Sequence, residues 1–420
     1  MNKSLRLAAL LLVLAGSAPL FAQSYRSFRD EYDDIRTRAR VRFGPLRILP
    51  SFRLTEVGRD SNVYFREDGG EVVPDFTATL SPEVRGYWLL GRSAILSVTE
   101  NPEYLFHAKE EALRAFSNSY SSGLRLLLLR RFSLGAEYHV RSHVRRSTSE
   151  LDRRIRDTAK GATGGFFLET PRGTALGFTG SLDDFRYKDV AAGLPEDVYA
   201  RALDRRETKA GFEVYYRVFS MSALFARAEY GRYDFASPES AWRDGSSVDL
   251  SGGLRFPVAG RARGTISLGW KSFRPDSAER RAFRGIVAAT DVAFRAGRFG
   301  FSLGYDRDTV FSYLESAYYY VDSRVRAGLS IYLTASFRVD GSVDMGNLSY
   351  PEPQEIRDGT GTVVVDRRRD VYRNFSVGPV LRITGRAGLG LTYNFYRRTS
   401  NVPGFKVRRD FVGAFLTYEF

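Results

Sequence analysis

The chain has 420 residues, of which 14% are aromatic, and its formal net charge is +14. It contains no cysteine, so no disulfide can staple its loops. The mean hydropathy is −0.29, and beyond the N-terminus no apolar run is long enough to span a membrane as a helix, which excludes a helical membrane protein.

The first 22 residues have the pattern of a secretory signal peptide. Lys3 and Arg6 give a positive start, residues 7–16 form a short apolar run, and small residues follow up to Ala22. We expect cleavage after Ala22, although Leu20 is not the small residue preferred three positions before the cut. An exported chain without a spanning helix can still enter a membrane as a closed barrel of strands.

Residues 23–44 form a densely charged segment that we assign to the periplasm. Phe28, Tyr32 and Ile35 recur at helical spacing, which predicts a short helix. Disorder is an equally open alternative, and a plug inside a barrel lumen is a third.

From residue 45 to residue 420, short turns alternate with long polar loops. Short turns such as those at Gly91 and Gly297 carry the glycine that tight hairpins need. Long loops rich in Asp, Arg, Gly and Ser separate them, the largest at 183–205 and 347–369. The segments between number about 18, and an even number places both termini on the short-turn side. This predicts an all-β fold: a transmembrane antiparallel up-and-down β-barrel with long extracellular loops and short periplasmic turns.

Apolar and polar residues alternate along most of these segments. Phe76, Leu80 and Trp88 fall on one face, whereas Glu83 and Arg85 fall on the other. Burying one unpaired charge costs on the order of several kcal/mol, so the polar face must meet water and the lumen must be hydrated. Opposite charges there would orient polar solutes or pair across strands. We expect the pore to be lined by Glu83, Arg85, Glu137, Arg141, Lys209, Glu213, Arg217, Arg255, Lys271, Asp306, Arg324, Arg326 and Arg338.

Pairs of arginines recur beside the long loops. The guanidinium group binds phosphate with two parallel hydrogen bonds, so these pairs suit the phosphates of lipopolysaccharide at the outer rim. An anion-attracting vestibule above the pore and solvated loop charge are the alternatives. The arginines concerned are Arg145, Arg146, Arg205, Arg206, Arg397, Arg398, Arg408 and Arg409.

The three histidines give little support for chemistry. His139 and His143 share one strand face, but their Cα atoms would be about 13 Å apart, too far for one metal ion. A serine hydrolase would need a serine beside His139, and Ser119 and Ser121 qualify only by face. We therefore predict no enzymatic activity, no catalytic residue, no metal site and no cofactor.

The segment 409–420 places Val412, Leu416, Tyr418 and Phe420 on one apolar face. Such a face suits a strand whose outer side meets lipid, with the two aromatic residues at the membrane boundary. It resembles the C-terminal signature of bacterial outer-membrane barrels. The resemblance implies that the barrel-assembly machinery recognises the strand that ends at Phe420.

Residues 44–57 read Gly-Pro-Leu-Arg-Ile-Leu-Pro-Ser-Phe-Arg-Leu-Thr-Glu-Val, and Asp60 and Asn62 follow. This start, together with Ser81 and Pro82, resembles the putative β-barrel porin 2 family. The resemblance implies an outer-membrane barrel over residues 45–420, sometimes linked to exopolysaccharide systems. It supplies no catalytic residue.

These features predict a porin-like passive channel of the bacterial outer membrane for small hydrophilic solutes, with anionic solutes as one option. One alternative is an accessory barrel for export or assembly of a surface polysaccharide. Another is a closed structural or adhesive barrel. The expected partners are outer-membrane lipid, lipopolysaccharide and the assembly machinery. Export argues against a nucleic-acid partner, and the oligomeric state stays open.

Overall fold

The computed structural model describes residues 27–146, 148–150, 154–170, 174–189, 201–218, 222–256, 262–314, 317–357, 363–402 and 405–420. The predicted signal peptide and the turns at 171–173, 219–220 and 257–260 lie outside these residues.

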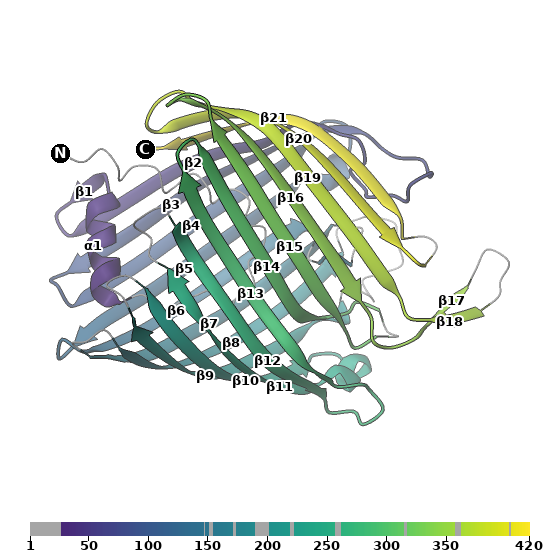
Figure 1. The fold of residues 1–420 in the computed structure, drawn as a ribbon, viewed down its shortest axis with the longest axis horizontal. Helices are drawn as coiled ribbons and strands as arrows, with labels where there is room; N and C mark the ends of the chain where they lie inside the picture. Colours follow the sequence, from purple (N-terminus) through teal and green to yellow (C-terminus); the bar gives the residue numbers. More distant parts are fainter. Residues whose placement is uncertain are drawn as a thin grey trace.

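Within the described residues, eighteen antiparallel strands form a closed barrel (Figure 1). Each strand pairs with its neighbours along the chain, and β21 closes the barrel against β2, with Phe52 opposite Tyr418 and Leu54 opposite Leu416. The predicted fold is therefore confirmed. The barrel strands are β2 (Leu46–Asp60), β3 (Asp75–Leu90), β4 (Ala94–His107), β5 (Ala115–Leu128), β6 (Phe132–Arg145), β7 (Ile155–Glu169), β8 (Ala175–Asp189), β9 (Arg205–Arg217), β10 (Ala223–Phe235), β11 (Gly245–Phe256), β12 (Ala262–Pro275), β13 (Phe283–Ala296), β14 (Phe299–Phe311), β15 (Tyr319–Tyr332), β16 (Phe337–Ser349), β19 (Arg369–Arg382), β20 (Ala387–Ser400) and β21 (Val407–Glu419).

A few short elements accompany the barrel. Helix α1, the edge strand β1 and the C-terminus lie at the short-turn end, whereas the small β17–β18 hairpin projects from the opposite end (Figure 1). The loop expected at 183–205 begins later, because β8 continues to Asp189, and the β17–β18 hairpin occupies part of 347–369. No helix in the described part of the chain is long and apolar enough to cross a membrane. The short elements are α1 (Phe28–Arg38), β1 (Val41–Phe43), β17 (Gln354–Arg357), β18 (Val363–Asp366) and the 3-10 helices Glu111–Leu113 and Pro238–Arg243.

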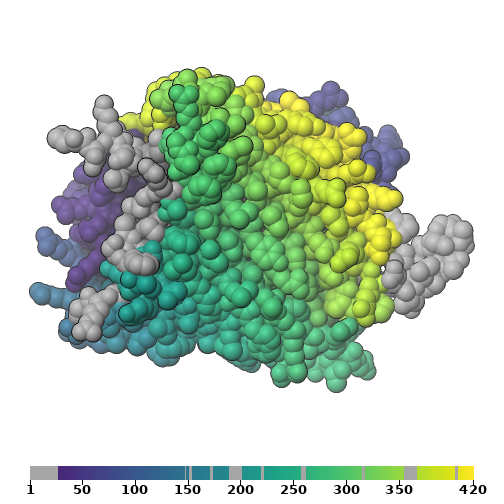
Figure 2. Space-filling view, in the orientation of Figure 1, coloured from purple at the N-terminus to yellow at the C-terminus, as the bar shows by residue number. Residues whose placement is uncertain are grey.

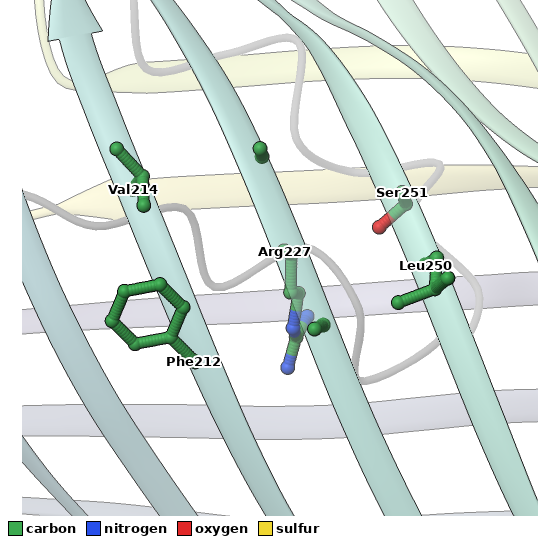
Figure 3. A pocket seen from close by; sticks show the side chains of 7 residues that line it. Phe212, Val214, Arg227, Leu250 and Ser251 are labelled. Atoms are coloured by element: carbon green, nitrogen blue, oxygen red, sulfur yellow. The ribbon is translucent and has the colours of Figure 1, made fainter.

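The two faces of the wall differ as the alternation predicts. On β3, Phe76 and Trp88 are 46% and 37% exposed, whereas Thr77 and Glu83 are buried. The same exposure of large apolar side chains continues around the barrel and forms the lipid-facing surface. A depression of about 400 Å³ on this surface lies over β9–β11, where the row of Phe212, Ala228 and Leu250 has its smallest side chain in the middle (Figure 3).

Two hairpins leave the wall near its long-loop end. The ladder between β5 and β6 stops at Asn118–Ser142, and the ladder between β13 and β14 stops at Ala288–Arg307. Beyond these points β6 pairs only with β7, and β14 pairs only with β15. Both hairpins therefore bend into the lumen instead of continuing the cylinder.

The bent end of the β14–β15 hairpin packs against the inner wall. Phe311 and Tyr319 join a buried cluster with Tyr233, Phe273 and Phe283, which face inward on β10, β12 and β13. The Phe311 ring centroid lies 5.2 Å from the centroids of both Tyr233 and Phe273. Side chains thus fill the lumen beside β10–β13 near the long loops.

An arginine covers each place where the ladder splits. Arg156 on β7 donates from Nη1 to the Phe116 carbonyl oxygen on β5 at 3.1 Å. Arg307 on β14 donates from Nε to the Ile286 carbonyl oxygen on β13 at 3.2 Å. Unpaired backbone carbonyls beside lipid are costly, so these contacts compensate for the ladder bonds that the bends remove.

Helix α1 lies against the inner wall at the short-turn end. It begins at Phe28 because the Ser27 hydroxyl accepts a hydrogen bond from the Asp30 amide. Phe28 and Ile35 are buried against Leu89 and the neighbouring strand β4. Leu89 faces inward because the residues on either side of it are exposed on the outer surface. The charged N-terminal segment therefore contains a helix that contacts the lumen wall.

Candidate functional site: a charged cavity inside the barrel

A cavity of about 1050 Å³ lies inside the barrel. Its walls are the inner faces of β14–β16, β19–β21 and β2–β4, completed by the described residues of the loop between β6 and β7. We call these residues (Arg146, 148–150 and Arg154) the clasp loop. The acidic residues of the lining are Glu56, Glu103, Asp306, Asp308, Asp322, Asp340 and Asp344. The basic residues are Arg145, Arg146, Arg154, Arg324, Arg326, Arg338 and Arg409.

Many of these charges are paired along the cavity wall. Arg324 on β15 donates from Nε to Asp344 on β16 at 2.7 Å, and Arg326 pairs with Asp306 on β14. Arg338 lies 2.8 Å from the Asp340 carboxylate on the same strand. The pairs hold the side chains in fixed places, so the cavity presents an ordered set of donors and acceptors.

Glu150 fastens the clasp loop inside the barrel. Its carboxylate accepts hydrogen bonds from the Ser312 hydroxyl at 2.6 Å, the Tyr313 amide at 2.9 Å and the Tyr350 hydroxyl at 3.0 Å. Burial raises the pKa of Glu150 above its usual range, and the hydrogen bonds and Arg368 offset part of this effect. The two bent hairpins are thus joined to each other through one carboxyl group.

Arg398 on β20, which is distant in the sequence, holds the same loop. Its Nη1 donates to the carbonyl oxygens of Ser149 at 3.2 Å and Glu150 at 2.9 Å. Arg146 donates to the Tyr396 hydroxyl at 3.0 Å, and its guanidinium group lies over the Phe65 ring at 4.6 Å. Since Glu150 and Arg398 are 248 residues apart in the chain, the loop connects distant parts of the wall.

His107 connects the other end of the loop to the wall. The ring is fully buried, with Nδ1 3.2 Å from the Asp75 carboxylate and Nε2 2.8 Å from Nη1 of Arg154. The clasp loop is therefore attached at both of its described ends, and its residues form part of the cavity wall.

Residues 41–420 match the family model described as Putative beta-barrel porin 2. The chain belongs to this family. The match confirms the resemblance seen in the first strands, and membership places this porin 2 barrel in the outer membrane. No curated protein matches the chain.

Several solved structures are similar to the porin 2 barrel. OccK3 (OpdO) of Pseudomonas aeruginosa is 13% identical, with 89% of this chain and 95% of that chain covered and a TM-score of 0.48. OccK2 (OpdF) of the same organism, solved in complex with glucuronate, is 13% identical, with 89% and 98% covered and a TM-score of 0.49. OccAB3 of Acinetobacter baumannii is 12% identical, with 89% and 99% covered and a TM-score of 0.48.

The residues expected to line the pore all lie on the inner face of the porin 2 barrel, but only some border the cavity. Asp306, Arg324, Arg326 and Arg338 do so. The remaining residues fall into two groups. Lys209, Glu213 and Lys271 are at least half-buried in the wall, and each forms an ion pair, such as Lys271–Asp308 at 2.7 Å. Glu83, Arg85, Glu137, Arg141, Arg217 and Arg255 face inward at other levels of the wall.

The arginine pairs divide between the two faces, because consecutive residues of a strand point in opposite directions. Arg206, Arg397 and Arg408 are exposed on the outer surface. Their neighbours face inward, where Arg205 pairs with Glu207 and Arg409 pairs with Asp60, both at 2.7 Å. The inward members face the lumen, so contact with lipid phosphates stays a prediction for the outward-facing Arg206, Arg397 and Arg408. These inward members are Arg145, Arg146, Arg205, Arg398 and Arg409.

Sequence reasoning missed Glu56 because of a bulge in β2. The register shifts between Leu54 and Val57, and Glu56 has a positive φ of 52°. Straight alternation would turn Glu56 toward lipid together with Leu54. The bulge instead turns it into the cavity, where Thr79 donates to its carboxylate at 3.1 Å. Glu103, Asp308 and Asp344 follow simple alternation, and extending that pattern would have found them.

The serine and histidine arrangement differs from the one considered for a hydrolase. Ser119 Oγ lies 2.7 Å from Nε2 of His143, whereas His139 Nε2 lies 2.9 Å from the Asp183 carboxylate. The serine thus contacts a different histidine from the expected one. Within the described residues, no cluster of His, Asp and Glu side chains has the makings of a metal site.

Proposed function

We propose that this porin 2 barrel is a passive channel for small hydrophilic solutes, narrowed by the clasp loop. The observation that carries the proposal is the cavity of about 1050 Å³ enclosed by the barrel and lined by fixed charges. A cavity of this size accommodates a solute the size of a monosaccharide or a small organic acid. Its polar lining can replace the water that such a solute loses on entry.

The charge of the lining bears on which solutes pass. Acidic and basic side chains are equally numerous, seven of each, so net charge alone gives no preference. The positions of the basic residues do give a preference. Arg145, Arg146 and Arg154 border the cavity at or beside the clasp loop, and Arg409 also borders the cavity. A cluster of guanidinium groups beside the cavity favours anions. The proposal therefore includes a preference for anionic solutes.

Conductance of the purified protein in planar phospholipid bilayers tests the channel. We expect a stable ohmic pore whose reversal potential in a salt gradient shows anion preference. Arg398→Gln removes the guanidinium group that holds the clasp loop, so it should raise the conductance about twofold or more. Arg397→Gln is the matched control, since the neighbouring side chain faces outward and should leave the conductance unchanged. A wild-type protein that never conducts would refute the channel.

A second candidate is a gated accessory barrel for surface polysaccharide. The observation that favours it is the covering of the lumen at both ends, by the clasp loop at one end and by α1 at the other. Such a barrel would conduct only after one cover is displaced. Conductance that appears in α1 variants but not in the wild type would favour this candidate.

A further inference from the structure

Three outward-facing arginines lie side by side on the last strands of the barrel. Arg373 on β19 is opposite Arg397 on β20, and Arg397 is opposite Arg408 on β21. All three side chains are exposed. Directly opposed residues of antiparallel strands have Cβ atoms about 5 Å apart, so the row holds three positive charges close together.

The row lies at the outer edge of the lipid-facing surface. The next outward-facing row toward the membrane centre contains Phe375 and Phe395, whose ring centroids are 6.4 Å apart, and Asp410 on β21. The row after that contains the exposed side chains of Val377, Tyr393 and Val412. The strands that carry these rows form the yellow-green to yellow surface in the upper right part of Figure 2. The arginines therefore sit where an apolar surface gives way to the long loops.

Opposed like charges destabilise a sheet unless something neutralises them. Arg408 shares the Asp410 carboxylate, at 3.3 Å, with the Tyr393 hydroxyl, at 2.7 Å. Arg373 and Arg397 form no ion pair within the described part of the chain. The row therefore has three guanidinium groups and one neighbouring carboxylate, so it keeps a surplus of positive charge.

The outer rim elsewhere shows how this barrel usually balances such charges. Arg206 on β9 lies between Asp184 and Asp234 in the register of the neighbouring strands. Arg232 pairs with Asp234 at 2.9 Å and with Asp276 at 2.8 Å. The arginines on β9 and β10 thus lie beside carboxylates, whereas the row on β19–β21 contains arginines only.

We propose that Arg373, Arg397 and Arg408 form a binding site for the phosphate groups of a glycolipid in the outer leaflet, namely lipopolysaccharide. Guanidinium groups bind phosphate through paired, charge-assisted hydrogen bonds. The acyl chains of the same lipid would lie along Phe375, Phe395 and the apolar rows below them. The phosphate groups of this lipid are attached to acyl chains. Such a molecule fits a site with arginines next to the long loops and apolar residues toward the membrane centre.

Native mass spectrometry of the full-length protein, titrated with bisphosphorylated lipid A, tests this site. The double variant Arg373→Gln/Arg397→Gln should bind at least about tenfold more weakly, since each lost charged hydrogen bond is worth roughly a factor of ten. Dephosphorylated lipid A should show the same weakening on the wild type. The matched control, Arg206→Gln/Arg232→Gln, should bind within about twofold of the wild type.

Three outcomes would overturn the proposal. One is equal binding by the wild type and the Arg373→Gln/Arg397→Gln variant. Another is equal binding of phosphorylated and dephosphorylated lipid A. The third is displacement of the lipid by inorganic phosphate at micromolar concentration, which would make this a site for free phosphate. The heat-dependent shift of the folded barrel on gels verifies that each variant is folded, and the exposed positions of all four arginines favour this result.

Discussion

The Glu150 carboxyl group is buried between the clasp loop and the β14–β15 hairpin, where it accepts three hydrogen bonds. Because burial raises its pKa, the neutral acid is favoured in the closed arrangement. Below the ordinary Glu pKa the group is neutral whether the loop is attached or free. As the pH rises through the raised pKa, the attached loop must bury a charge, so its attachment weakens.

The expected result is a clasp loop that exchanges amide hydrogens faster at neutral than at acidic pH, after correction for intrinsic rates. Hydrogen exchange of peptides covering 148–150 and 312–314 measures this difference. Glu150→Gln keeps a neutral side chain of the same size and should remove the pH dependence. His107→Gln is the control for the other titrating group attached to the loop. A Glu150→Gln variant with undiminished pH dependence would assign the effect elsewhere.

Among the elements, α1 has few anchors for its position in the mouth of the barrel. Phe28 and Ile35 supply the buried apolar contacts, and the Tyr32 hydroxyl donates to the Gly91 carbonyl oxygen at 2.8 Å. Glu31 also pairs with Arg125 on the inner face of β5. Burial of two large apolar side chains stabilises the docked helix by about 3–6 kcal/mol. One buried unpaired charge is therefore enough to offset most of this docking free energy.

Ile35→Asp should release α1 and increase the conductance, because burying an unpaired carboxylate costs several kcal/mol, on the order of the whole docking energy. Arg36→Asp introduces the same residue at the next position, which is exposed, and should leave the conductance unchanged. Single-channel recordings compare the two variants. If both conduct like the wild type, α1 does not restrict the channel.

The same elements show what a sequence can predict. Alternation and turn residues are local properties, so they predicted the eighteen strands, their faces and the short turns. Applied to each arginine pair, alternation would also have predicted that Arg397 and Arg398 face opposite sides of the barrel wall. The bends at Ser142 and Arg307 depend on which residues meet across the lumen, as Glu150 meets Ser312. Such contacts join distant segments, and no local pattern encodes them.

At the scale of the whole molecule, the barrel exists only when its last strand has paired with its first. β21 bonds β20 on one side and β2 on the other, and the Phe420 amide donates to the Pro50 carbonyl oxygen at 3.2 Å. The Phe420 side chain is 51% exposed and contacts Tyr418 edge-on, with ring centroids 4.7 Å apart. An aromatic pair of this kind contributes about 0.5–1.5 kcal/mol, a small part of the stability of a closed barrel.

Phe420→Ala should therefore affect assembly in cells more than stability. We expect refolding in detergent to be nearly unchanged, because the lost contact is small. If the assembly machinery recognises this strand through Phe420, the folded fraction in the outer membrane should fall several-fold. The heat-dependent gel shift of membrane fractions measures it. Phe375→Ala removes another outward-facing aromatic residue that pairs with a neighbour. An equal loss of assembly in both variants would mean that apolar surface in general, rather than recognition of Phe420, limits insertion.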